Sequence, residues 1–152
     1  MDFFDPKILE IFKQLLLAVT LGAAIGVERE LAHKSAGMRT NSLVALGSAL
    51  FSIISGSFSG PATDPTRIAA QIVTGIGFLG AGLIVFQGER VQGLTTAAGV
   101  WVAAAIGMAV GFGMYEVGIF TTILTILVFA IMWPIEKKFV KVFAKEENTN
   151  PD

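Results

Sequence analysis

Residues 64–101 read DPTRIAAQIVTGIGFLGAGLIVFQGERVQGLTTAAGVW, and this stretch decides the fold of the chain. Its central part, from Ile68 to Phe86, is a run of nineteen residues without a charged side chain. At about 1.5 Å of rise per residue, a helix of this length just crosses a hydrocarbon core of about 30 Å. The run therefore predicts a membrane-spanning helix, followed by a short charged loop and the start of another helix.

Glycines are frequent in this run and recur at helical spacing elsewhere in the chain. Each costs an exposed helix roughly 1 kcal/mol relative to alanine, whereas membrane helices use glycine for close backbone approach. The spacing predicts Gly-rich helix packing, within one chain or between copies. The run also matches a dinucleotide-binding fingerprint formally, but it lacks the strand that must precede one. The expected packing glycines are Gly22, Gly26, Gly75, Gly77, Gly80, Gly82, Gly107 and Gly111.

The composition limits the class of protein. Of 152 residues, 53% are hydrophobic and 15% are charged, which is too much apolar surface for one water-soluble core. The net charge of −1 and the lack of a basic stripe with aromatic residues argue against nucleic acid as a partner. The chain has no cysteine, so thiol chemistry and thiolate metal sites are excluded. The lipid bilayer is the expected surrounding.

The remaining uncharged runs predict four further helices. Asp5 and Pro6 form a typical helix start, although a short apolar run of this kind is also found in signal peptides, which have a basic leader that this chain lacks. A second run covers residues 40–63, and the 45-residue interval 91–135 contains one charge, Glu116, and is long enough for two crossings. Pro134 is expected to end or kink the fifth helix. The prediction is an all-α polytopic membrane bundle of about five transmembrane helices in residues 1–135, followed by a basic amphipathic juxtamembrane segment and disordered tail in residues 136–152.

The distribution of Lys and Arg over the connectors predicts the orientation. Three of them, Lys7, Lys13 and Arg67, fall on one side of the expected bundle. Eight fall on the other side, which the positive-inside rule assigns to the cytoplasm. We therefore expect the N-terminus outside and the C-terminus in the cytoplasm. The eight residues are Arg29, Lys34, Arg39, Arg90, Lys137, Lys138, Lys141 and Lys145.

Polar residues at the helix ends form a candidate functional cluster. Those at the expected cytoplasmic ends can converge, where a helix that begins at Thr95 or Thr96 would present its positive end and a hydroxyl to an anionic group. Asp64 fits the cap of the third helix, and Gln71 lies one turn deeper than Arg67. The alternative interpretation is that these residues are ordinary charges at the membrane interface and helix caps without a functional role. The candidates are Glu28, Arg29, Arg39, Asp64, Arg67, Gln71, Thr95 and Thr96.

Three blocks of the sequence resemble the MgtC/SapB family of bacterial inner-membrane proteins. They read GVERELAHKSAGMRTNSLVALGSALF (26–51), DPTRIAAQIVTGIGFLGAGLIVF (64–86) and VQGLTTAAGVWVAAAIGMAVGFG (91–113). The resemblance implies a five-helix domain in the bacterial cytoplasmic membrane and a link to growth in low magnesium. It also implies a short form, since longer members continue into a soluble cytoplasmic domain. Positions that fit the family pattern are Glu28, Arg39, Thr40, Asp64, Arg67, Gln71, Gly75, Gly77, Gly80, Gly82, Gly93, Thr95, Thr96 and Trp101.

Two functions remain open at this point. The first is a regulatory or interaction protein that contacts another membrane protein, and the second is an oligomeric transporter or channel for Mg²⁺ or another small ion. A magnesium path should offer carboxylates at membrane depth, and none lies near the centre of a span. An enzyme is not expected, because the sequence has no nucleophile–base pair, no histidine cluster and no paired carboxylates at catalytic spacing. No cofactor and no metal site are expected.

Overall fold

The computed structural model describes residues 5–58, 64, 66–88 and 90–147, and within them the chain forms five helices and one small hairpin. The helices are α1 (Pro6–Leu31), α2 (Met38–Ser57), α3 (Arg67–Leu83), α4 (Leu94–Gly111) and α5 (Tyr115–Glu147). The strands β1 (Val85–Gln87) and β2 (Arg90–Gln92) pair antiparallel between α3 and α4. The predicted all-α membrane helix bundle is confirmed.

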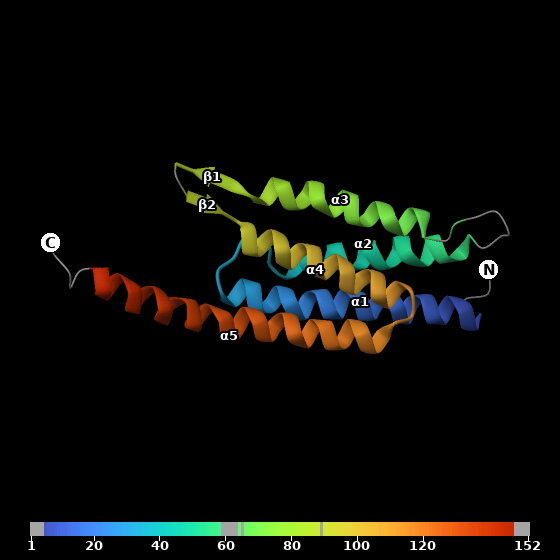
Figure 1. Cartoon of the computed structure of the whole chain (residues 1–152). Helices are drawn as coiled ribbons and strands as arrows, with labels where there is room; N and C mark the ends of the chain where they lie inside the picture. Colours follow the sequence, from blue (N-terminus) through green and yellow to red (C-terminus); the bar gives the residue numbers. More distant parts are fainter. Residues whose placement is uncertain (1–4, 59–63, 65, 89, 148–152) are drawn as a thin grey trace.

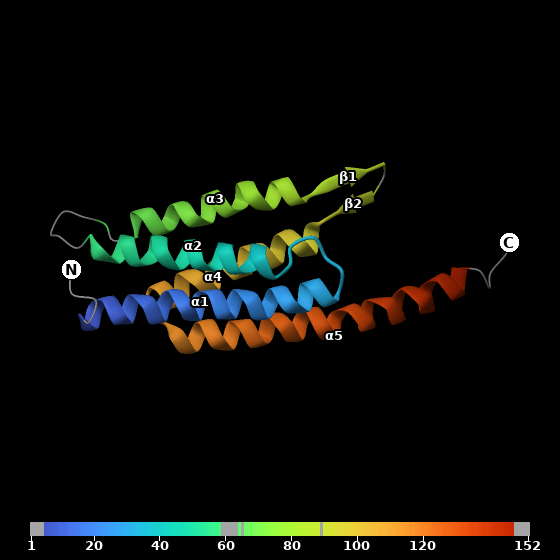
Figure 2. The same ribbon diagram turned by 180° about the vertical axis from the view of Figure 1, so that it is seen from behind.

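The helices lie along one common axis, so the bundle that they form has two ends (Figures 1 and 2). One end holds the end of α1, the start of α2, the hairpin and the start of α4. The opposite end holds the starts of α1, α3 and α5. In the described residues, α1, α2, α4 and the Tyr115–Glu136 part of α5 are long and apolar enough to cross a membrane.

Helix α2 lies between α1 and α4, and glycines on both neighbours allow the close approach. A Cβ atom on Gly22 of α1 would lie 2.5 Å from the carbonyl oxygen of Asn41. A Cβ atom on Gly107 of α4 would overlap the carbonyl oxygen of Ala45, and one on Gly111 would lie 2.5 Å from that of Ala49. Gly26 is equally close to the backbone of Met38. Backbone contact across both faces of α2 therefore holds the centre of the bundle together.

The α3 glycines behave differently. A Cβ atom added to Gly75, Gly77 or Gly82 would meet no atom within 4 Å, and one on Gly80 would make an ordinary contact with the Cβ of Ala97 at 3.8 Å. Of the two kinds of packing that the sequence leaves open, Gly75, Gly77 and Gly82 take no part in the first, between helices of the described chain, because these positions face open space. Packing between copies stays a prediction.

Helix α3 is also shorter than its uncharged run. It has 17 residues, or about 26 Å, because the chain leaves the helix at Ile84 and enters β1. The hairpin was not predicted, since its first strand continues the apolar run without a break. At the other end, Thr66 and not Asp64 occupies the cap position, and the Ser55 hydroxyl of α2 accepts the Ala69 N–H at 3.3 Å.

Helix α5 runs through Pro134 and continues to Glu147, so of the two expectations for this proline, an end or a kink, the end is wrong and the kink stays a prediction. Proline removes one N–H, but membrane helices tolerate the loss where neighbouring groups compensate. The basic amphipathic segment expected after residue 135 belongs to this continuous helix up to Glu147. Its side chains from residue 137 on lie outside the described ones, as do residues 148–152. The expected start of α1 agrees with the structure, where the Asp5 carboxylate accepts the Lys7 N–H at 2.9 Å.

Candidate functional site

A cavity of about 1420 Å³ opens at the hairpin end of the bundle, and we call it the end cavity. Its walls come from the last turn of α1, the α1–α2 loop, β2, the first turns of α4 and one face of α5. These segments are far apart in sequence and meet because the helices alternate in direction (Figure 1). Charged, hydroxyl and apolar side chains all line the end cavity.

Arg29 is the buried charge of the end cavity. It lies in the last turn of α1, where a cation complements the negative end of the helix dipole, and it is only 5% exposed. Its Nε donates to the Glu28 carboxylate at 2.5 Å, and its guanidinium lies 3.5 Å from the centroid of the Phe129 ring of α5. Both contacts offset the free-energy cost of removing the charged guanidinium from water.

Gly99 of α4 makes the contact between Arg29 and Phe129 possible. A Cβ atom at this position would lie 2.8 Å from the Cζ of the Phe129 ring. The ring therefore rests directly on the backbone of α4 while its face covers the guanidinium of α1. Three helices meet at this point.

The end of α1 fixes a second cation beside Arg29. The N–H of Lys34 donates to the carbonyl oxygen of Arg29 at 2.9 Å, and the N–H of His33 donates to that of Glu30 at 3.0 Å. These two bonds form a Schellman motif, in which His33 takes the left-handed conformation with φ of 56°. His33 and Lys34 consequently turn back over the helix end and line the end cavity.

The N-terminus of α4 also faces the end cavity. Gly93 precedes the helix with φ of 90°, and a Cβ there would overlap the carbonyl oxygen of Leu83, so glycine is required. No side chain caps the helix. Thr95 and Thr96 lie inside the first turn, which corrects the expectation that one of them starts and caps it. Thr96 is 6% exposed and lines the end cavity.

The structure brings half of the predicted cluster together. Glu28, Arg29, Thr95 and Thr96 line the end cavity. Arg39 is exposed at the start of α2 and is not part of the lining. The other three predicted residues, Asp64, Arg67 and Gln71, lie at or near the start of α3, at the opposite end of the bundle (Figure 1).

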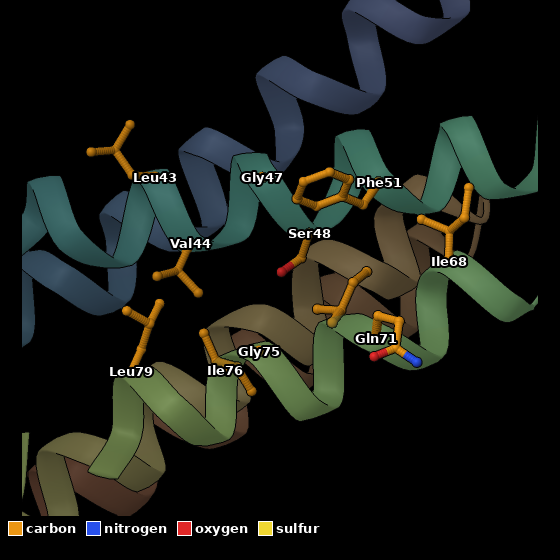
Figure 3. Close-up of a pocket in the computed structure, with 11 residues that line it drawn as sticks. Leu43, Val44, Gly47, Ser48, Phe51, Ile68, Gln71, Gly75, Ile76 and Leu79 are labelled. Atoms are coloured by element: carbon orange, nitrogen blue, oxygen red, sulfur yellow. The ribbon is translucent and has the colours of Figure 1, made fainter. Parts of the chain in front are cut away.

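Asp64 and Gln71 occupy different surroundings there. The Asp64 carboxylate accepts the Thr66 hydroxyl at 2.7 Å and the Thr66 N–H at 2.9 Å, and these hydrogen bonds hold the pKa of Asp64 below its usual value. Gln71 is among the residues that line an apolar groove of about 540 Å³ between α2 and α3, and Ser48 lies on the facing wall (Figure 3). Gly47 and Gly75 leave open space on its two walls.

Sequence reasoning missed several residues of the end cavity. Phe129 lies in a uniformly apolar run, and Gly99 resembles the other glycines of α4, so no pattern marks either one. Lys34 entered the sequence prediction only as one of the positive residues of the connectors that predict the orientation, and not as a candidate site residue. In the described part of the chain, no three His, Cys, Asp or Glu side chains are placed to hold a metal ion.

Comparisons with known proteins place the chain in a family. The MgtC family model matches residues 15–138. An Escherichia coli K12 protein named "Putative magnesium transporter YhiD" is 48% identical over 80% of this chain and 60% of its own length. Protein MgtC of Brucella abortus 2308 is 48% identical over 78% of this chain and 49% of its own length. Protein MgtC of Salmonella typhimurium LT2 is 51% identical over 72% of this chain and 47% of its own length.

The chain therefore spans about half to three fifths of the length of these relatives. No solved structure matches it.

Proposed function

This chain belongs to the MgtC family, and we propose that it is a bacterial inner-membrane protein that regulates magnesium homeostasis through contact with another membrane protein. The name of the E. coli relative supports the link to magnesium. The role is non-enzymatic. The end cavity is the place where a partner or a regulatory ligand reaches the bundle from one membrane face.

The observation that carries the regulatory role is the Glu28–Arg29 pair. A magnesium path requires carboxylates that are free to bind a hydrated divalent cation. Glu28 is instead engaged by Arg29 at 2.5 Å, and the buried guanidinium repels a cation that approaches the same carboxylate. The charges of the end cavity thus favour a neutral or anionic ligand over Mg²⁺.

A transporter is the second candidate, supported by the name of the E. coli relative and by the α2–α3 groove. In an oligomer, Gln71 and the open glycine face of α3 could line a path between copies. Homo-oligomerisation is part of this alternative and is compatible with the regulatory role as well.

Flux and growth together decide between these roles. In liposomes containing the purified chain, we expect Mg²⁺ entry to equal that of protein-free liposomes, because no described carboxylate is free in the bundle interior. In bacteria that lack the protein and grow in low magnesium, we expect the wild-type chain to restore growth and Arg29→Gln to restore less than a tenth of it. Protein-dependent Mg²⁺ entry that Gln71→Ala abolishes would instead establish transport.

We also propose that the hairpin end faces the cytoplasm, with the N-terminus outside. The structure gathers Arg29, Lys34, Arg39 and Arg90 at this end, whereas Lys7, Lys13 and Arg67 belong to the opposite one. The cysteine-free sequence allows a direct test. In intact cells, a membrane-impermeant maleimide should label Thr66→Cys strongly and Lys34→Cys less than a tenth as much, until the cells are opened. Labelling of Lys34→Cys in intact cells would reverse the orientation.

A further inference from the structure

We propose that the end cavity binds a phosphate-bearing ligand, whose phosphate group lies against the N-terminus of α4. This inference rests on the proposed function, in which the end cavity receives a ligand. Its first basis is the uncapped start of α4. The N–H groups of Leu94, Thr95 and Thr96 have no acceptor within their helix, and Gly93 supplies no side-chain cap. All four residues line the end cavity.

The second basis is the Thr96 hydroxyl. Thr96 is 6% exposed and lines the end cavity, and no hydrogen-bond partner for its hydroxyl is found anywhere in the described part of the chain. The other described threonine buried to this degree behaves differently, since the Thr122 hydroxyl donates to the Gly118 carbonyl oxygen at 2.8 Å within its own helix. Although the residue is buried, its hydroxyl oxygen is not among the fully buried unpaired atoms of the described residues, so the hydroxyl keeps access to the end cavity and can donate to an acceptor that a ligand supplies there.

The charges around these donors favour an anion. Lys34 and Arg29 line the end cavity on the α1 side, opposite the start of α4. Two carboxylates also line it: Glu28 is paired with Arg29, and Glu136 lies on the α5 wall. The N–H groups and the Thr96 hydroxyl of α4 then offer donors from one element, and the Lys34 ammonium group of the α1–α2 loop offers donors from a second. A phosphate group, with several acceptor oxygens in tetrahedral arrangement, can use more of these donors at once than a planar carboxylate can.

The α4 and α5 walls of the end cavity also carry apolar side chains, which on α5 alternate with the hydroxyl groups of Thr121 and Thr125. The apolar side chains include Val102 of α4 and Leu124, Val128 and Met132 of α5. A lipid headgroup could place its phosphate on α4 and its acyl chains along these apolar side chains. A water-soluble phosphate ester would use the polar groups alone. The lipid and the water-soluble ester carry the same phosphate group, and the experiment below includes one measurement for each of them.

Binding to the purified full chain tests the inference. One arm measures phosphatidic acid by native mass spectrometry in detergent, with diacylglycerol as the phosphate-free lipid, and the other measures inorganic phosphate by calorimetry. We expect phosphatidic acid to bind at least tenfold more tightly than diacylglycerol, and Thr96→Val combined with Lys34→Gln to weaken that binding at least tenfold. Competition by inorganic phosphate identifies a soluble source, and its failure to compete identifies the lipid headgroup.

The matched control combines Thr122→Val with Lys13→Gln, which makes the same chemical changes outside the end cavity. It should bind within twofold of the wild type. Lys34→Gln alone, at an exposed position, serves if Thr96→Val lowers the yield of folded protein. Equal binding of phosphatidic acid and diacylglycerol, or full binding by the cavity variants, would overturn the inference. That result would leave the magnesium role standing, because the growth assay does not depend on phosphate binding.

Discussion

Gly107→Ala is expected to lower the free energy of unfolding by about 3 kcal/mol, the upper part of the usual range for overpacking a core. The added Cβ would overlap the carbonyl oxygen of Ala45 and lie 2.9 Å from its Cα. Because these atoms belong to the backbone of α2, no side-chain rotation can relieve the overlap, and α2 and α4 must separate. Unfolding in mixed detergent with increasing dodecyl sulfate, followed by circular dichroism, measures the change.

Gly75→Ala is the matched control, since it makes the same substitution in a helix of the same bundle. Its Cβ would meet no atom within 4 Å, so only the intrinsic helix preference remains, which favours alanine by up to about 1 kcal/mol. The two variants should therefore move the free energy of unfolding in opposite directions. A loss at Gly75 as large as that at Gly107 would mean that α3 packs against another copy of the chain.

These two glycines show how far the sequence could predict the fold. Uncharged runs predict the helices well, because a membrane-spanning segment must be apolar along its whole length. A high glycine content predicts that close packing occurs but does not reveal the partner, since α3 has more glycines than α1 and yet Gly75, Gly77 and Gly82 meet no other helix of the described chain. The end of α3 was missed for a related reason: Val85 and Phe86 are as apolar as the helix before them.

The candidate site was predictable in part. Polar residues at the ends of antiparallel helices gather at the two ends of the bundle. This rule alone predicts that Glu28, Arg29, Thr95 and Thr96 lie close together, as they do in the end cavity. The rule does not identify the charge that is buried. Burial of Arg29 depends on a ring 100 positions further along the chain and on Gly99, which makes room for that ring. Such a three-body contact leaves no local pattern in the sequence.

Arg29→Gln is expected to destabilise the bundle by about 3 kcal/mol, the usual effect of removing one partner from a buried ion pair. Arg29 is 5% exposed, and the Glu28 side chain is 19% exposed. Without the guanidinium, the carboxylate keeps its charge in a poorly solvated place, and Phe129 loses the cation over its face. The same unfolding assay measures the loss.

Arg39→Gln is the matched control, because Arg39 is exposed, carries the same charge at the same end of the bundle and makes no ion pair with any described residue. Its effect should stay within about 0.5 kcal/mol. The double variant Glu28→Gln with Arg29→Gln separates lost charge pairing from lost packing. It removes the stranded carboxylate, so it should be more stable than Arg29→Gln alone. If the two single losses simply add, the pair has no coupling, and Arg29 stabilises the bundle through its contact with Phe129 instead.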